Sequence, residues 1–431
     1  MTNLTSIRFE EREEAPRAFL ERISNIVRSS PKFRIKLFRC GFLLCLLGFF
    51  GCKLIGILQG QAFKTSVKPN HVVEATGTSV LGPTGTAEVI NLTWSPCHIG
   101  CCPSSQKIVQ VLDKHPSDLV CFDVNFKQKV QRFMFLTTFN HLASTYLAAA
   151  KKFLEDISSQ SDFCGEILWR IADDSTLEPA FVFQLSEKGI AVMAHSVFGY
   201  PSENTLLVPN FHFILSNGFS DFASYLEKNS KPFRDLHQQV FWAGTTTGEP
   251  CAYNSTCEKN CDGVERVKLA RAAKSISWVR AKLSSTCQIC AGNDIKLRNE
   301  GILEEPVPEL DWIKNRGIID IDGNVDAWGL TWRLMSNSVV FRVKSRFIGY
   351  FSNLLQDGVH FISLEADFSD LQSKTSVVLK NDEETLKHLS NLSLNARKLI
   401  HEHKYGNVVR AVALRLSVGL GSRFCSDLHA N

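Results

Sequence analysis

The strongest constraint on the fold is an alternation of short apolar runs with helical segments through residues 180–402. The apolar runs have the length of single strands, and stretches with helical apolar spacing separate them. This alternation is typical of α/β proteins with mainly parallel sheets. Because the pattern occurs in two consecutive units, it predicts two doubly wound, Rossmann-like domains that face a cleft.

The expected elements follow from this pattern. We expect strands at residues 180–185, 190–194, 205–209, 239–243, 317–321, 338–343 and 360–364. We expect helices at residues 126–157, 219–228, 264–283, 328–335, 348–355 and 383–402. The resulting organisation is an N-terminal acceptor-side domain, a C-terminal donor-side domain and a tail, at residues 93–235, 236–410 and 411–431.

A second feature is the segment from Cys40 to Leu58, which is apolar except for Lys53. Its length matches the roughly 20 residues that a helix needs to cross a bilayer. Four basic residues precede it between positions 32 and 39, so the positive-inside rule places the N-terminus in the cytosol. We expect a cytosolic tail, a transmembrane signal anchor and a lumenal stem at residues 1–36, 37–58 and 59–92. A cleaved signal peptide and a buried soluble helix are the alternatives.

Cysteine usage indicates an oxidising compartment for the part of the chain that follows the apolar segment. Of the 14 cysteines, 11 lie beyond the apolar segment. The spacing of Cys257, Cys261, Cys287 and Cys290 also suits a four-thiolate zinc site, but disulfides are the preferred interpretation in a lumen. Asn-X-Ser/Thr triplets predict a glycoprotein, at Asn91, Asn254 and Asn391.

Charge and motif content exclude several classes of protein. The net charge is +4, from 48 basic and 44 acidic residues, so no nucleic-acid partner is expected. With 44% hydrophobic residues, the chain can bury a large core. No GxxxxGK[ST] or GxGxxG motif occurs, which disfavours a P-loop enzyme and a dinucleotide-dependent epimerase.

The densest group of candidate ligand contacts is Phe241-Trp-Ala-Gly-Thr-Thr-Thr-Gly248, where an apolar run enters a turn of glycines and hydroxyls. Gly244 and Gly248 allow backbone amides to approach a ligand, and the hydroxyls of Thr245, Thr246 and Thr247 can contact phosphate or sugar oxygens. Arg266 follows on an expected helix. An ordinary strand-to-helix turn is the alternative interpretation of this group.

A second group follows the apolar run at residues 317–321. The turn Asp322-Gly323-Asn324 precedes a helix that carries Arg333, at the sheet edge where α/β folds bind ligands. Arg333 can pair with a diphosphate and offset the charge of a departing nucleotide. A surface arginine beside a turn is the alternative. Thr331 stands where a calcium-binding loop beginning at Asp320 needs glutamate, so calcium binding is not expected.

A third group runs from His360 to Leu371. His360 and the acids of the following loop are expected at the same sheet edge, with Asp370 either at the ligand or capping the next helix. Alone, His360 is more typical of a structural histidine.

These motifs in this order resemble glycosyltransferase family 90, which includes protein O-glucosyl- and O-xylosyltransferases. The resemblance covers roughly residues 165–405 and is strongest at residues 318–371. It implies a two-domain GT-B fold, a UDP-sugar donor that is a substrate rather than a cofactor, inversion at the anomeric carbon and no required metal. By this resemblance the donor contacts comprise Gly244 to Gly248, Arg266, Asp322 to Asn324, Arg333, His360 and Asp370, and residues 205–211 are similar to the family's acceptor-side segment.

Two departures from the family pattern bear on activity. Ala243 stands where the family carries a donor-binding arginine, and Arg266 or Lys268 can substitute for it. Aligning residues 181–187 with the family's strand before the catalytic aspartate places Glu187 at the position of the general base. The alternative is a solvated charge beside Lys188, with Asp173 and Asp174 next as candidates for the base.

The sequence therefore predicts a single-pass type II membrane protein of the Golgi or the endoplasmic reticulum, with a lumenal inverting glycosyltransferase. It would transfer xylose or glucose from a UDP-sugar to a hydroxyl of a protein or glycan. The C-terminal residues match no retention tetrapeptide, which favours the Golgi. The alternative function is a catalytically inactive family member that acts as a glycan-binding or chaperone-like protein.

Overall fold

The computed structural model describes residues 95–96, 119–126, 130–135, 143–171, 177, 179–199, 201–248 and 260–419. They all belong to one compact unit, Thr78–Asn431. The expected cytosolic tail, signal anchor and stem lie outside the described residues. Among the residues that are described, no helix combines the length and the apolarity that crossing a membrane requires.

The first sheet is mixed, with both parallel and antiparallel neighbours. Its order is β1-β3-β2-β4-β5-β7, in which β2 runs antiparallel to both β3 and β4 and the other neighbours are parallel. The strands are β1 (Ser95–Pro96), β2 (Leu119–Asn125), β3 (Val130–Phe135), β4 (Cys164–Arg170), β5 (Ala191–Ala194) and β7 (Thr205–Leu207). Its core includes Phe122, Phe153 and Trp169, all fully buried.

One helix prediction and one strand prediction are wrong in the first half of the chain, by which we mean residues 95–235. Residues 130–135 form β3 rather than the start of a helix, because they pair with β2 along their length, as in Phe122 opposite Phe133. The expected strand at 180–185 lies in a helix, α5 (Pro179–Glu187). There Phe181, Val182 and Leu185 are buried while Phe183 is exposed, which is the spacing of one helix face.

The second sheet is entirely parallel, with the order β13-β11-β10-β8-β9. Its strands are β8 (His237–Thr245), β9 (Val279–Ser285), β10 (Asn315–Asp320), β11 (Val339–Val343) and β13 (Ile362–Leu364). Every residue of β10 is buried, as expected for a central parallel strand. Because the chain passes from β8 to β9 on one side and then to β10 on the other, the strand order reverses between β8 and β10.

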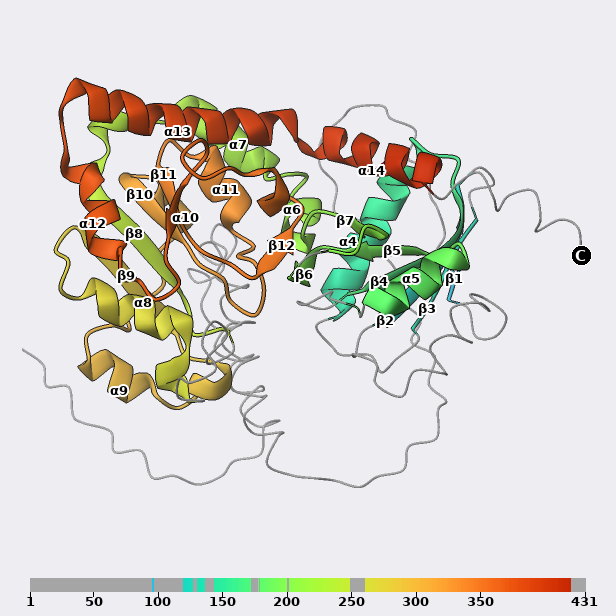
Figure 1. Cartoon of the computed structure of the whole chain (residues 1–431), viewed down its shortest axis with the longest axis horizontal. Helices are drawn as coiled ribbons and strands as arrows, with labels where there is room; N and C mark the ends of the chain where they lie inside the picture. The colour runs from blue at the N-terminus through green and yellow to red at the C-terminus, as the bar shows by residue number, and fades with distance from the viewer. Residues whose placement is uncertain are drawn as a thin grey trace, which may run out of the picture. The chain divides into compact units, whose positions relative to one another are not determined.

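Helices cover this sheet and lead into it (Figure 1). They are α7 (Ser220–Asn229), α8 (Glu265–Ala273), α9 (Asp294–Asn299), α10 (Glu309–Trp312), α11 (Leu330–Met335), α12 (Leu371–Thr375) and α13 (Glu383–Glu402). Residues 279–283, expected to end a helix, belong instead to β9, where Val279, Ala281 and Leu283 are buried alternately. The expected helix at 348–355 is replaced by β12 (Phe347–Gly349) and a short 3₁₀ turn.

Two connections join the halves. β12 pairs antiparallel with β6 (Ser196–Phe198), so a ribbon from the second half meets one from the first. After α13 the chain returns to the first sheet through α14 (Tyr405–Gly419), which lies beside α4 (Ala143–Ser158) (Figure 1). Tyr405 Oη donates to Asp156 Oδ2 at 2.5 Å across this contact. Residues 411–419, expected in a tail, are therefore helical.

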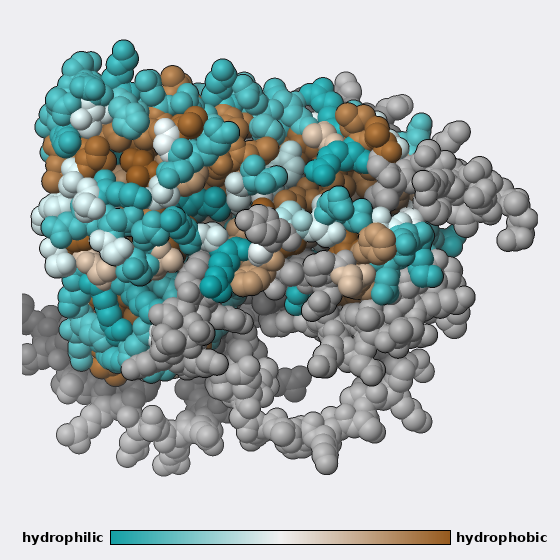
Figure 2. Space-filling model, viewed as in Figure 1, coloured by the Kyte–Doolittle hydropathy of each residue, from teal (hydrophilic) through white to brown (hydrophobic). Residues whose placement is uncertain are grey.

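The outer surface is mixed in polarity. Figure 2 shows apolar and hydrophilic residues side by side along α13 and α14. Leu394, Leu414 and Val418 are exposed there. Scattered exposed apolar side chains of this kind are normal for globular proteins.

Candidate functional site

A pocket of about 600 Å³ lies at the carboxyl end of β8, and we call it the central pocket. Gly244, Thr245, Arg266 and Arg333 all line it. The sequence predicted each of these residues as a donor contact, and the fold brings them together from β8, α8 and α11. The volume lies in the range of small-molecule sites in proteins.

The turns after β8 and β10 meet where the strand order reverses. We call residues 244–248 the β8 turn and residues 322–324 the β10 turn. The amide of Gly248 donates to Asn324 Oδ1 at 3.1 Å. Gly248 has a φ of 126°, which favours glycine, and a Cβ there would lie 3.2 Å from the carbonyl oxygen of Gly323. The contact between the two turns therefore depends on a glycine.

Arg266 holds these two turns together. Its Nη1 donates to Thr247 Oγ1 at 2.6 Å and to the Thr245 carbonyl at 3.3 Å. Its Nε and Nη2 donate to the carbonyls of Asp322 and Ile321 at 2.7 and 3.2 Å. Burial, with the charge of Arg333 as a further cause, lowers the pKa of Arg266 to about 10. Arg266 remains a cation at neutral pH, but its donors are directed at the turns.

Arg333 is the second cation of the central pocket and is 8% exposed. Its Nη1 forms a buried ion pair with Asp320 Oδ1, at the end of β10. The guanidinium carbon lies 5.1 Å from the ring centre of Trp312 and 5.3 Å from that of Trp332. Carboxylate and aromatic rings thus fix the guanidinium at the pocket wall.

Aromatic side chains form much of the remaining wall, and sequence reasoning did not single them out as ligand contacts. Trp242, Trp312, Trp328 and Trp332 line the pocket from the second half, and Phe219 and Phe222 line it from the first. His212, on α6 (Phe211–Leu215), also lines the pocket, with its ring centre 4.3 Å from that of Trp328. A signal was present for His212, because it directly follows the segment 205–211 that resembles an acceptor-side motif.

The other predicted residues of the two turns act on the turns themselves. Thr246 is buried, and its hydroxyl accepts from the Cys287 amide at 2.8 Å. Asp322 is buried, and its Oδ2 accepts from Ser345 Oγ. Gly323 lies so close to Arg266 that a Cβ there would be 2.9 Å from Nη2. These residues shape the site rather than line it.

Three predicted residues lie away from the residues that line the central pocket. His360 Nδ1 accepts from the Gln356 amide at 3.0 Å, and partial burial lowers the pKa of His360. Asp370 pairs with Lys374 at 2.8 Å and accepts from the Glu365 amide at 2.9 Å, but it makes no side-chain cap on α12. Glu187 is the exposed last residue of α5. Its assignment as the general base rested on a strand at residues 181–187, and these residues are helical instead.

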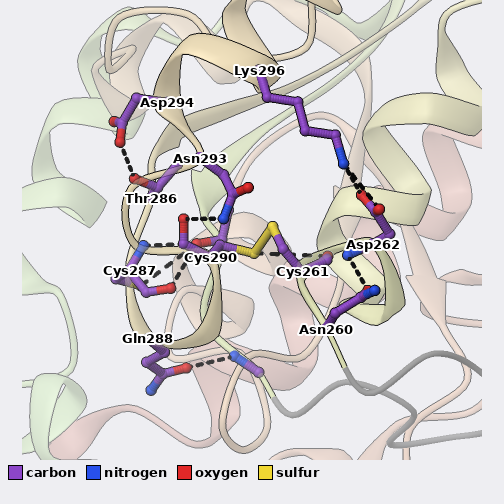
Figure 3. Close-up of a disulfide and its surroundings, with 12 residues drawn as sticks. Asn260, Cys261, Asp262, Thr286, Cys287, Gln288, Cys290, Asn293, Asp294 and Lys296 are labelled. Carbon is purple, nitrogen blue, oxygen red and sulfur yellow. Dashed lines mark hydrogen bonds and ion pairs between the residues drawn. A yellow bond between two sulfur atoms is a disulfide. The ribbon is translucent and has the colours of Figure 1, made fainter.

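Cys261 and Cys290 form a disulfide (Figure 3). The disulfide interpretation of this insert is therefore confirmed for these two residues, and they are not available as zinc ligands. Cys257 lies outside the described residues. Cys121 and Cys164 are also disulfide-bonded.

Known proteins resemble part of this chain. Protein O-glucosyltransferase 2 of Danio rerio is 34% identical over 109 residues, which are 25% of this chain and 21% of the relative. Protein O-glucosyltransferase 3 of Homo sapiens is 28% identical over 112 residues, 25% of this chain and 22% of the relative. The chain thus aligns with about a fifth of the length of these relatives. It matches no protein-family profile.

Solved structures of glycosyltransferases are also similar at a low level. The UDP-glucose complex of Anabaena HepE has a TM-score of 0.33 and 12% identity, covering 56% of this chain and 68% of that one. A glycosyltransferase of Rickettsia africae has a TM-score of 0.32 and 11% identity, and the match covers 67% of this chain and 84% of that one. Scores of this size do not establish a shared fold. The sheets and the pocket described above define an α/β protein with a pocket at its topological switch point.

Proposed function

We propose that this chain is a glycosyltransferase of the protein O-glucosyltransferase type, with a GT-B architecture and a UDP-sugar donor. It transfers glucose or xylose, with inversion, to a hydroxyl of a protein or glycan. The observation that carries the proposal is the meeting of Gly244, Thr245, Arg266 and Arg333 in one pocket at the end of β8. The partial identity to protein O-glucosyltransferases supports the same class of reaction.

The chemistry of the pocket suits a nucleotide sugar. Arg333 presents a fixed positive charge, which stabilises the negative charge that develops on a departing diphosphate. The tryptophan and phenylalanine rings offer flat apolar faces against which a nucleobase or a sugar ring packs. An inverting transfer breaks the glycosidic bond to UDP and forms the new bond from the acceptor oxygen in one displacement.

The acceptor hydroxyl must lose a proton in this step. Among the described residues that line the pocket, His212 and Glu309 are the side chains that can accept one. His212 lies on the first half of the chain and faces the pocket beside Trp328, whereas Arg333 belongs to the second half. We therefore assign the general base to His212, in place of Glu187, which does not line the pocket.

A turnover assay with the purified protein tests the proposed function. UDP release from UDP-glucose or UDP-xylose, measured with a library of protein and glycan acceptors, should exceed release without acceptor. The anomeric configuration of the product, read by NMR coupling, reports inversion. A folded sample that releases no UDP with any acceptor would contradict the enzymatic proposal.

One observation favours the alternative of an inactive glycan-binding or chaperone-like protein. Ala243 lines the pocket where the family carries an arginine, and Arg266 is occupied by the turns instead of replacing it. Binding of UDP without turnover, together with binding of an acceptor glycan, would support this alternative.

A place in the secretory pathway remains part of the proposal. The disulfide between Cys261 and Cys290 supports an oxidising compartment. Anchoring by residues 37–58 as a type II protein is proposed from the sequence, and fractionation of cells into membrane and soluble fractions tests it.

A further inference from the structure

The chain between Cys287 and Cys290 lies against the β8 turn, and we call these residues the brace loop. It forms a 3₁₀ turn, Gln288–Cys290, that follows β9. The loops after β9, β8 and β10 therefore lie next to one another, because these three strands are neighbours in the sheet. Nothing in the proposed donor site uses the brace loop directly, since none of its residues lines the central pocket.

Gln288 contacts both turns of the site at once. Its Oε1 accepts from the Gly248 amide at 3.2 Å, and its Nε2 donates to Asn324 Oδ1 at 2.9 Å. Asn324 Oδ1 also accepts from the Gly248 amide. One side chain thus connects the ends of the β8 turn and the β10 turn.

The backbone of the brace loop makes a second connection. The Cys287 amide donates to Thr246 Oγ1 at 2.8 Å, and that hydroxyl donates to the Cys287 carbonyl at 3.2 Å. Thr246 is fully buried, so these hydrogen bonds are shielded from water. The β8 turn is therefore held at both its centre and its end.

The disulfide anchors the far end of the loop. It joins Cys290 to Cys261, which begins the short turn that leads into α8. α8 carries Arg266, whose side chain also donates hydrogen bonds to both the β8 turn and the β10 turn. The disulfide thus ties the brace loop to the segment that positions Arg266.

Gln288 adopts a left-handed backbone with a φ of 51°, a conformation that favours glycine. A residue other than glycine keeps such a conformation only where the surrounding contacts hold it there. Here the side chain supplies the amide that contacts Gly248 and Asn324.

We propose that the brace loop positions the β8 turn for donor binding, with Gln288 as the positioning residue and the Cys261–Cys290 disulfide as its anchor. This inference rests on the proposed function of the central pocket, because it assigns the β8 turn to the donor. Gln288 does not touch the donor. It sets the distance between the β8 turn and the β10 turn, and donor binding depends on that distance.

Two substitutions at position 288 separate positioning from stability. Gln288→Ala and Gln288→Gly remove the same amide, but only glycine suits the left-handed backbone. We expect both variants to raise the Kd for UDP by about three- to tenfold, the loss of one or two exposed hydrogen bonds. We expect the glycine variant to keep the wild-type Tm and the alanine variant to lose a few degrees.

The matched control is Thr286→Ala. Thr286 Oγ1 donates to Asp294 Oδ2 at 2.7 Å, an exposed hydrogen bond in the same connection that does not reach the β8 turn (Figure 3). This variant should bind UDP as the wild type does. Cys261→Ser with Cys290→Ser removes the anchor and should raise the Kd for UDP in the same direction as the Gln288 variants.

Calorimetric titration with UDP and with UDP-glucose distinguishes the outcomes. If the wild-type protein binds neither, the proposed donor site is wrong. If the wild type binds and Gln288→Gly binds equally well, the donor site stands and the positioning role is overturned. Where turnover is measurable, a rise in KM for the donor with kcat retained is the pattern expected of positioning.

Discussion

Arg333 and Asp320 form a buried ion pair beneath the central pocket, with side-chain exposures of 10% and 2%. Asp320 ends β10, and Arg333 lies on the following helix, so the pair closes the strand-to-helix connection at the edge of the sheet where the central pocket lies. Arg342 Nε also approaches Asp320, at 3.7 Å. The carboxylate thus holds the guanidinium in place at the pocket wall, and under the proposed function Arg333 has both a structural and an electrostatic role.

Removal of Arg333 should therefore cost stability as well as donor binding. Arg333→Ala leaves Asp320 as a buried, under-compensated charge, and breaking such a pair costs about 3–5 kcal/mol. We expect a large loss of unfolding free energy in urea, contrary to the expectation for a surface arginine. A fully stable Arg333→Ala protein would show that Arg342 compensates Asp320 alone.

Arg333→Lys tests the electrostatic role more selectively. Lysine retains the positive charge but not the planar, two-sided hydrogen bonding of the guanidinium. We expect the variant to fold, with a Kd for UDP raised about tenfold, the effect of losing about 1.4 kcal/mol. The companion variant Arg342→Lys changes the same kind of side chain next to Asp320 but outside the lining of the central pocket, so it should bind UDP normally.

The sequence could predict the central residues of the site because each follows an apolar strand. Gly244 and Thr245 come at the end of β8, and Arg333 lies beyond β10, so neighbouring parallel strands bring them to one edge. The alternation also predicted α13 at its observed bounds. A polar N-cap and a long amphipathic repeat both indicate a helix there.

The remaining features depend on contacts that are distant in the sequence. The role of Arg266 as a clamp requires backbone carbonyls of two separate turns, which no local pattern contains. The helix α5 was predicted as a strand because a short apolar run has no distinctive period, and that error misplaced Glu187. Trp312 reaches the pocket from an element with no recognisable motif, whereas His212 directly follows the segment 205–211 that resembles an acceptor-side motif.

Gly323→Ala should disturb the clamp around Arg266. An added Cβ would lie 2.7 Å from Thr247 Oγ1 and 2.9 Å from Arg266 Nη2, so one of these groups must move. We expect weaker UDP binding and a loss of about 1–3 kcal/mol in unfolding free energy. The control is Gly406→Ala, on the described helix α14, where a Cβ meets nothing within 4 Å and the better helix propensity of alanine should slightly stabilise the protein.

Asp326 should make stability depend on pH. It is 7% exposed, and burial raises its pKa from 3.8 to about 6. The folded protein therefore holds this proton up to a higher pH than the unfolded chain does. Between about pH 4 and pH 6 the unfolded state binds fewer protons, so the contribution of Asp326 to unfolding free energy falls as pH rises and stays low above pH 6.

Asp326→Asn tests this dependence. The asparagine cannot ionise, so the variant should lack this part of the pH slope and should be more stable than the wild type at neutral pH, by roughly 2–3 kcal/mol. Urea unfolding at several pH values measures both effects. Parallel curves for the two proteins from pH 4 to about pH 7 would exclude Asp326 as the titrating group.

Substitution of the two candidate bases decides where the acceptor proton goes. His212 lines the central pocket, whereas Glu187 lies at the end of α5 and outside that lining. If His212 is the base, His212→Gln should lower kcat by about 10²- to 10⁴-fold with little change in the Kd for UDP, because the lost step is proton transfer and not donor binding. Glu187→Gln should then turn over close to the wild-type rate. The opposite ranking, a large loss at Glu187 and none at His212, would return the base to the position predicted from the sequence and would require the first half of the chain to close over the donor before reaction.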